Sequence, residues 1–153
     1  GEVCAQALYR GQALVARDMQ TRNFLLHAAS EEVDHLNWTR DRVKQLKGRT
    51  SLLDPVFYAL SAVMGTSTGL IGDKLSLGFV DETEQQVEQH LASHLQKLPQ
   101  ADLPSLAIVK QMQVDESEHA ANARAEGGAA LPKPLQCMMH FMGRVMTSLT
   151  YWV

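Results

Sequence analysis

Apolar side chains recur at intervals of three or four residues along almost the whole of the 153-residue chain. This spacing is that of one face of an α-helix, and no segment sustains the strict alternation of a β-strand. The pattern predicts helices over residues 2–17, 21–47, 55–72, 74–97, 105–125 and 132–152. We therefore expect an all-α fold, a four-helix bundle with one or two additional helices.

Glycine and proline mark the ends of several predicted helices. Gly48 lies where the second helical pattern stops, and the pair Gly127–Gly128 follows the fifth, as expected of residues that end a helix in the left-handed conformation. Pro55 suits the first turn of the third helix. The segment 99–104, which has a proline at each end, separates the fourth helix from the fifth.

The composition excludes several classes of protein. A formal net charge of −3 excludes a strongly basic nucleic-acid binder, so no nucleic-acid partner is expected. Cys4 and Cys137 are too few and too far apart for a disulfide framework or a thiolate metal site, and we expect both to be small buried residues. The length suits one domain, residues 1–153. Because the chain begins without an initiator methionine or a signal peptide, we expect an N-terminal piece to precede Gly1.

Residues 55–72 contain no charged side chain. An uncharged run of this length raises the question of a membrane span. Three glycines and several serines and threonines make this run only mildly hydrophobic, so we expect a buried or membrane-facing helix in preference to a spanning one. The last segment, residues 132–152, is apolar and rich in methionine. It suits either an adaptable wall beside a ligand or ordinary core packing.

The most informative pattern is Glu-x-x-His, which occurs as Glu32 to His35 and again as Glu116 to His119. Three residues along a helix turn the chain by about 300°, so the carboxylate and the imidazole of each motif point to the same side and can grip one metal ion. One such motif alone is more often a solvated helix face. Two of them, 84 residues apart on different predicted helices, favour a metal site.

A further glutamate precedes each motif. Glu2 lies 30 residues before Glu32, and Glu84 lies 32 residues before Glu116, so the chain reads as two similar halves. Four carboxylates and two imidazoles on four helices form the donor set of the di-iron carboxylate proteins with a ferritin-like bundle. Such ligands suit iron or manganese.

Two aspartates and one tyrosine accompany these motifs. Asp34 and Asp115 are each a candidate for orienting a ligand histidine of the opposite half, and the spacing does not say which of them does so. Tyr9, two turns after Glu2, faces the same way. We expect it to be a packed core residue that could reach the metal region.

The fourth predicted helix carries three more polar candidates. Glu88 lies one turn after Glu84 and could be an alternative ligand, a proton carrier or an exposed acid. His90 and His94 also lie one turn apart. With no matching pair elsewhere, we expect them to face the solvent or to support the ligands from outside.

Several stretches resemble the 5-demethoxyubiquinol hydroxylase family of ubiquinone biosynthesis, and its bacterial branch in particular. They are GEVCAQALY followed by GQ within 1–12, EEVDHL at 31–36, LGFV and TEQ within 77–85, and Met112 followed by DESEH at 115–119. The ending VMT at 145–147 with Tyr151 also fits, so the resemblance covers nearly the whole chain. It implies the same iron ligands as the spacing does: Glu2, Glu32, His35, Glu84, Glu116 and His119.

The resemblance also implies an activity, the hydroxylation of the ring of a demethoxy polyprenyl quinol or quinone at the carbon that is later methylated. Two iron ions would be the cofactor and O2 the co-substrate of this monooxygenase. The electrons would come from NADH or another reductant; no glycine-rich dinucleotide fingerprint occurs, and a separate reductase or an accessory lipid-binding partner would serve equally. His90 and Tyr151 match positions that the family is associated with using around its iron ligands and on the side where the reductant acts.

A polyprenyl tail is too long for a bundle of this size to enclose. We expect it to stay in the membrane or to run along an apolar groove, which gives residues 52–72 and 135–153 a reason to be apolar. The net charge of +2 over residues 131–153 favours anionic lipid head groups. We therefore expect a peripheral protein on the cytoplasmic face of a bacterial inner membrane, or on the matrix side of the mitochondrial inner membrane in a eukaryote.

Three other functions compete with this hypothesis. A ferritin-like iron-storage or ferroxidase protein would share the ligands but would assemble into a shell of many subunits. A peroxide-reducing di-iron protein commonly has an additional four-cysteine iron site, which the two cysteines here cannot form. The third is a non-catalytic helical module, whether it binds metal or not.

Overall fold

The computed structural model describes the backbone of residues 1–152 and the side chains of residues 1–150. Within this part the chain forms six helices and no strand: α1 (Glu2–Val15), α2 (Met19–Gln45), α3 (Asp54–Ile71), α4 (Asp73–Lys97), α5 (Leu103–Ala125) and α6 (Lys133–Trp152). Each helix lies within a few residues of a predicted one. The expected all-α fold is confirmed.

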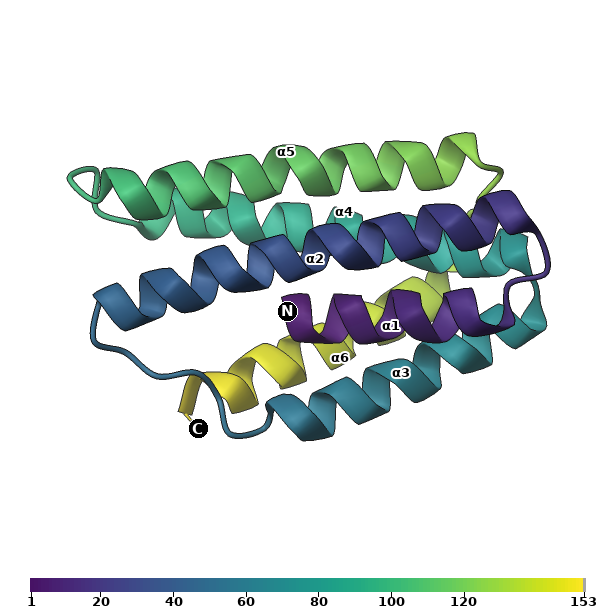
Figure 1. The fold of residues 1–153 in the computed structure, drawn as a ribbon, viewed down its shortest axis with the longest axis horizontal. Helices are drawn as coiled ribbons and strands as arrows, with labels where there is room; N and C mark the ends of the chain where they lie inside the picture. The colour runs from purple at the N-terminus through teal and green to yellow at the C-terminus, as the bar shows by residue number, and fades with distance from the viewer. Residues whose placement is uncertain (153) are drawn as a thin grey trace.

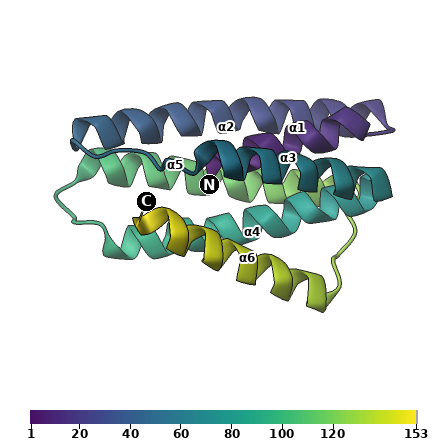
Figure 2. The same ribbon diagram turned by 90° about the horizontal axis from the view of Figure 1, so that it is seen from below.

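Four helices form the bundle and two flank it. α1 and α2 run antiparallel beside each other, and so do α4 and α5 (Figure 1). α3 packs along α1 on the side away from α2, and α6 lies against α4 (Figures 1 and 2). The structure therefore has the four-helix bundle with two additional helices.

Glycines let α1 and α3 approach each other closely. A Cβ atom added to Gly65 would lie 2.0 Å from the carbonyl oxygen of Leu8, and one added to Gly11 would lie 2.4 Å from the carbonyl oxygen of Ala62. No side chain fits at such distances, so the glycine-rich face of the uncharged run serves helix packing. Among the described residues, no helix is both long enough and apolar enough to cross a membrane.

The ends of the helices only partly follow the prediction. Gly127 has a φ of 93° just after α5, as expected of a left-handed stop. α2 also ends close to its predicted stop signal Gly48, but the left-handed residue there is Lys47, with a φ of 57°. Gly48 instead donates its N–H to the carbonyl oxygen of Val43 at 2.9 Å.

A polar contact fixes the end of α2 against the start of α5. Asp102 caps α5 by accepting a hydrogen bond from the backbone N–H of Ser105 at 3.2 Å. Arg42 of α2 donates to Asp102 at 2.6 Å and to the hydroxyl of Ser105 at 2.8 Å. The contact sets the register of α2 against α5, the two helices that carry the Glu-x-x-His motifs.

The apolar core lies between α1, α2 and α4 and includes Leu8, Tyr9, Leu25, Phe79 and Val80. The cysteines do not both join it as expected. Cys4 is half-buried on α1, but Cys137 is exposed on α6. Among the described side chains of α6, Met139 is the one that is buried. The expectation of a buried Cys137 was wrong.

Candidate metal centre

A buried cluster of acids and imidazoles lies half-way along the bundle. Its members Glu32, Glu84, Glu116 and His119 each offer one ligand atom, and these atoms lie within 4.8 Å of one another. All four side chains are buried. They come from α2, α4 and α5, where the helical spacing turns each motif toward the axis of the bundle.

His35 belongs to the same cluster. Its side chain is only 1% exposed, and its Nδ1 atom lies 3.3 Å from Glu116 Oε1 and 3.8 Å from Glu32 Oε2. The fold thus brings together five of the six predicted ligands from helices that are far apart in the sequence.

Glu2 lies at the edge of this cluster. Its carboxylate is 23% exposed and lies 3.4 Å from the amino group of Gly1. Burial raises the pKa of Glu32 to about 7, and the charges of Glu116 and Glu2 add to this rise. The role of Glu2 as a ligand stays a prediction.

When no metal is bound, the acids and imidazoles of the cluster shift one another's pKa values. Burial by itself would lower the pKa of His35 and of His119, but the carboxylates close to each imidazole outweigh it and raise each pKa to about 11. Burial would likewise raise the pKa of Glu116, yet the two histidines lower it to about 2. Burial and the charge of Glu116 raise the pKa of Glu84.

Three buried atoms of the cluster lack a hydrogen-bond partner: Glu32 Oε1, Glu84 Oε2 and His35 Nδ1. Leaving buried polar atoms unpaired is costly, and such atoms in a folded protein point to an unseen partner. A cation held between these side chains would pair with all three. The donors are carboxylate oxygens and imidazole nitrogens, a set suited to iron or manganese, so the residues fit the predicted metal.

Each histidine of the cluster is held from behind by an acid of the opposite motif helix. The Nε2 atom of His119 lies 2.8 Å from Glu31 Oε2, and that of His35 lies 3.1 Å from Asp115 Oδ2. These contacts turn both Nδ1 atoms toward the cluster. Of the two predicted candidates, Asp115 plays this part, whereas Asp34 is exposed.

Glu31 is the supporting residue that the sequence interpretation missed. A signal for it was present, because Glu31 directly precedes Glu32 just as Asp115 directly precedes Glu116. The two halves of the chain therefore match at the supporting acids as well as at the ligands.

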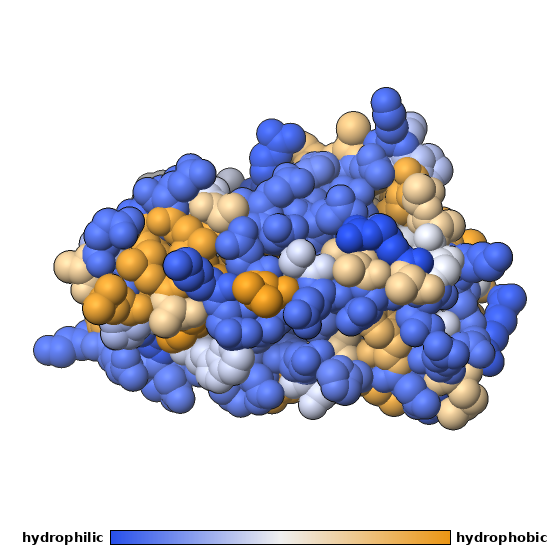
Figure 3. All heavy atoms as spheres, turned by 90° about the horizontal axis from the view of Figure 1, so that it is seen from above, coloured by the Kyte–Doolittle hydropathy of each residue, from blue (hydrophilic) through white to orange (hydrophobic). Residues whose placement is uncertain are grey.

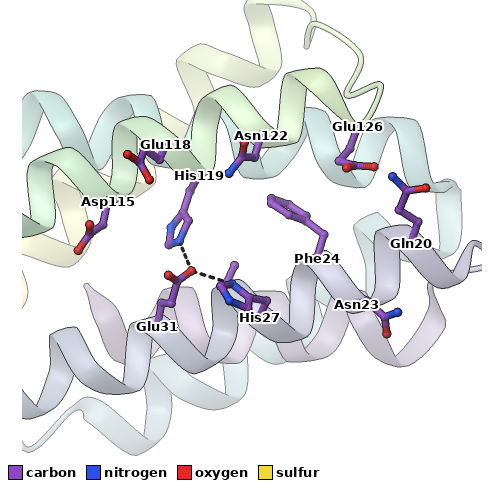
Figure 4. A pocket seen from close by; sticks show the side chains of 11 residues that line it. Gln20, Asn23, Phe24, His27, Glu31, Asp115, Glu118, His119, Asn122 and Glu126 are labelled. Atoms are coloured by element: carbon purple, nitrogen blue, oxygen red, sulfur yellow. Dashed lines mark hydrogen bonds and ion pairs between the residues drawn. The ribbon is translucent and has the colours of Figure 1, made fainter.

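A further layer of contacts holds these acids. His27 Nδ1 lies 3.0 Å from Glu31 Oε2, and Gln111 Nε2 donates to Asp115 Oδ1 at 2.8 Å. Figure 4 shows Glu31 between His119 and His27 on facing helices. An open pocket of about 600 Å³ lies here between α2 and α5, lined by all of these residues except Gln111, so the support of His119 can be reached from the solvent.

Tyr9 is wholly buried, and its hydroxyl donates a hydrogen bond to Glu84 Oε1. It is therefore both the core residue that the spacing predicts and a direct contact of the cluster. Burial and the negative charge of Glu84 raise the pKa of Tyr9 well above its usual value, so the phenol keeps its proton.

The other polar candidates lie away from the cluster. His90 is exposed, and its Nε2 atom lies 2.9 Å from that of His94, so these two face the solvent together. Glu88 lines a smaller pocket of about 380 Å³ between α4 and α5. The side chain of Tyr151 lies outside the described residues.

Known proteins match this chain along nearly its whole length. The family model for "Ubiquinone biosynthesis protein COQ7" matches residues 1–150. The chain belongs to this family. It is 53% identical to the 3-demethoxyubiquinol 3-hydroxylase of Nitrosospira multiformis and 54% identical to those of Nitrosomonas europaea and Verminephrobacter eiseniae. Each alignment covers 153 residues, which are all of this chain and 74% of the relative.

These matches confirm the resemblance noted in the sequence, including its bacterial character. The relatives are bacterial, and their name is that of a hydroxylase acting on a demethoxyubiquinol. The matched region includes both Glu-x-x-His motifs and both upstream glutamates.

Proposed function

We propose that this COQ7-family chain is a di-iron monooxygenase that hydroxylates the ring of a demethoxyubiquinol in ubiquinone biosynthesis. The observation that carries the proposal is the buried cluster of Glu32, Glu84, Glu116, His35 and His119, with three unpaired atoms that a cation would satisfy. The relatives named for this reaction, more than half identical to the chain, support the same conclusion.

The cluster has two ends, each suited to one ion. Glu84 and His119 share one end, where His119 Nδ1 lies 3.6 Å from Glu84 Oε1. His35 would serve the other end with Glu2, and Glu32 and Glu116 lie between the ends. When bound, two iron ions supply the activation of O2. The four glutamates would balance the charge of two ferrous ions, and the burial of the other five ligand side chains would keep bulk water away. These five are Glu32, Glu84, Glu116, His35 and His119.

The reaction replaces a C–H bond of the substrate ring by a C–OH bond. One oxygen atom of O2 enters the ring, and the other leaves as water together with two protons. Two electrons must therefore come from a reductant, either NADH or a separate reductase.

The polyprenyl tail of the substrate fits an apolar side of the molecule. α3 and α6 lie on the same side of the bundle, and the N-terminus of α1 is seen between them (Figure 2). Both helices present exposed apolar side chains: Val56, Leu60, Val63, Leu70 and Ile71 of α3, and Met138, Phe141, Met142, Val145 and Leu149 of α6. We call these ten residues the apolar face.

The opposite side of the bundle is mainly hydrophilic, with apolar clusters toward both ends (Figure 3). Lipid binding through the apolar face would place the substrate tail in the bilayer while the ring enters the bundle. The protein then sits on a membrane as a peripheral protein, at the cytoplasmic face of a bacterial inner membrane. Washing membranes with salt and carbonate should release it.

Complementation tests the proposed activity. A bacterial strain without its own demethoxyubiquinol hydroxylase accumulates the demethoxy precursor, and this chain should restore ubiquinone in it, as measured by mass spectrometry. The variants Glu32→Ala and Glu116→Ala should be present at the same level and fail to restore it. Rescue by Glu116→Ala would overturn the mechanism, and assembly into a shell of many subunits would support iron storage instead.

A further inference from the structure

The hydrogen bond between Tyr9 and Glu84 distinguishes the end of the cluster that contains Glu84 and His119 from the other end. The hydroxyl of Tyr9 binds Oε1 of Glu84, and Oε2 of the same carboxylate is buried without a partner. Glu84 is thus held by one oxygen and offers the other to a cation.

The repeat in the chain shows where a matching donor would have to be. Tyr9 lies seven residues after Glu2, and the residue seven positions after Glu84 is Leu91. A leucine side chain has no hydrogen-bond donor. At this register position, therefore, the second half has no counterpart of the phenol.

The supports of the two histidines do not show this difference. His119 is held by Glu31, which contacts His27, and His35 is held by Asp115, which accepts a hydrogen bond from Gln111. These residues stand at corresponding positions of the two halves. Two contacts distinguish the ends of the cluster: Tyr9 donates to the buried Glu84, whereas the partly exposed Glu2 lies against the amino group of Gly1. Of the two, the phenol is the one that fixes a buried carboxylate.

We propose that Tyr9 is a positioning residue that makes the two metal positions unequal, so that the position formed by Glu84 and His119 binds the first ion and binds it more tightly. The inference rests on the proposed metal centre. A ligand that is already fixed loses little conformational freedom when the ion binds, so its contacts contribute more to affinity. Loss of a hydrogen-bond partner behind a metal ligand typically weakens metal binding by about 10- to 100-fold.

Stepwise metal binding tests the inference without turnover. The metal-free protein is titrated with Co²⁺ and followed by visible absorption and calorimetry. We expect two separate steps. Tyr9→Phe should weaken the first step by about tenfold and leave the second unchanged. Tyr58→Phe removes the same hydroxyl from a half-buried tyrosine of α3 and should change neither step.

A second pair of variants assigns the steps and does not depend on how Tyr9→Phe folds. Glu84→Gln should remove the tighter step, and Glu2→Gln should affect only the weaker one. Two equal steps in the unchanged protein would overturn the inference, and so would an equal weakening of both steps by Tyr9→Phe or a reversed assignment. Failure to bind Co²⁺, Mn²⁺ or Fe²⁺ at all would refute the proposed metal centre itself, which is a distinguishable result.

Discussion

At the residue scale, each imidazole depends on an acid that the Glu-x-x-His motif does not contain. Glu31 reaches His119, and Asp115 reaches His35, each across the interface between α2 and α5. An imidazole held in this way has its ring orientation fixed, with Nδ1 directed toward the cluster. The Glu-x-x-His motif supplies the imidazole, and an acid on the opposite helix orients it.

Removing the charge of Glu31 should therefore weaken metal binding. Glu31→Gln is expected to lower the affinity by about tenfold or more, because the amide holds the imidazole of His119 less strongly. A competition assay with a colorimetric chelator measures the change. Asp34→Asn, at an exposed position of the same helix, is the matched control and should bind metal as the unchanged protein does. Equal affinities for all three proteins would contradict the role of Glu31.

Metal binding should release protons and strengthen as the pH rises. The pKa values of His35 and His119 are raised to about 11 without metal, so both imidazoles are protonated at pH 7. An ion must displace these protons from Nδ1. Titration with Co²⁺ in weakly buffered solution with a pH indicator should report at least one proton for each histidine. Protons held by Glu32 and Glu84, whose pKa values are also raised, add to this release. Affinity that does not change between pH 6 and pH 9 would count against this view.

The same pKa shifts predict how the stability of the metal-free protein depends on pH. A histidine whose pKa is higher in the folded than in the unfolded state stabilises the fold fully below the unfolded value, about 6.5. This contribution is lost as the pH rises toward 11. The metal-free protein should therefore unfold at lower urea concentration at pH 10 than at pH 7. Greater stability at pH 10 would be the contrary result.

At the scale of the elements, the placement of α1 depends on its contact with α3. α1 carries Glu2 and Tyr9, so any shift of this helix moves a predicted ligand and the phenol that holds Glu84. The glycines at the α1–α3 contact set the distance between the two helices. Helix packing and the metal centre are therefore linked through one interface.

Filling this interface should destabilise the protein. Gly65→Ala would place a methyl group 2.0 Å from the carbonyl oxygen of Leu8 and push the helices apart, at a cost of about 1–3 kcal/mol or more. Gly143→Ala is a control within α6, where the nearest atom lies 3.8 Å away, and should be neutral or slightly stabilising. Thermal unfolding followed by circular dichroism compares them. Equal melting temperatures would show that α1 and α3 are not tightly packed.

At the scale of the whole molecule, polar and apolar surfaces are separated. α3 and α6, which carry the apolar face, lie on one side of the bundle (Figure 2). The side seen from above is mainly hydrophilic, with smaller apolar clusters toward both ends (Figure 3). Large apolar areas on the surface of a protein generally mark an interaction site. This arrangement suits an enzyme whose substrate is held by a bilayer.

A charge on the apolar face should weaken binding to membranes. Phe141 is 64% exposed, so Phe141→Glu is expected to reduce co-sedimentation with anionic phospholipid vesicles and to leave the melting temperature unchanged. Leu103→Glu alters an equally exposed residue at the start of α5 and should bind vesicles normally. If both variants bind as the unchanged protein does, the apolar face is not the membrane contact.

The features that the sequence predicted correctly are those decided within one helix. Helical periodicity located the six helices, because burial of one face repeats with the turn of the helix. The spacing of Glu32 and His35, or of Glu116 and His119, places both groups on one face whatever the neighbouring helices do. The doubled motif therefore identified the residues of the cluster before their surroundings were seen.

Only the tertiary structure decided what depends on the rotation and approach of neighbouring helices. It selected Glu31 and Asp115 over Asp34, joined Tyr9 to Glu84, and left Cys137 on the surface. Each of these outcomes depends on the axial position and the rotation of two neighbouring helices. The close packing of large and small side chains sets both. The sequence by itself determined which acids and histidines face one another in the cluster, whereas the packing of the helices determined which other residues hold them in place.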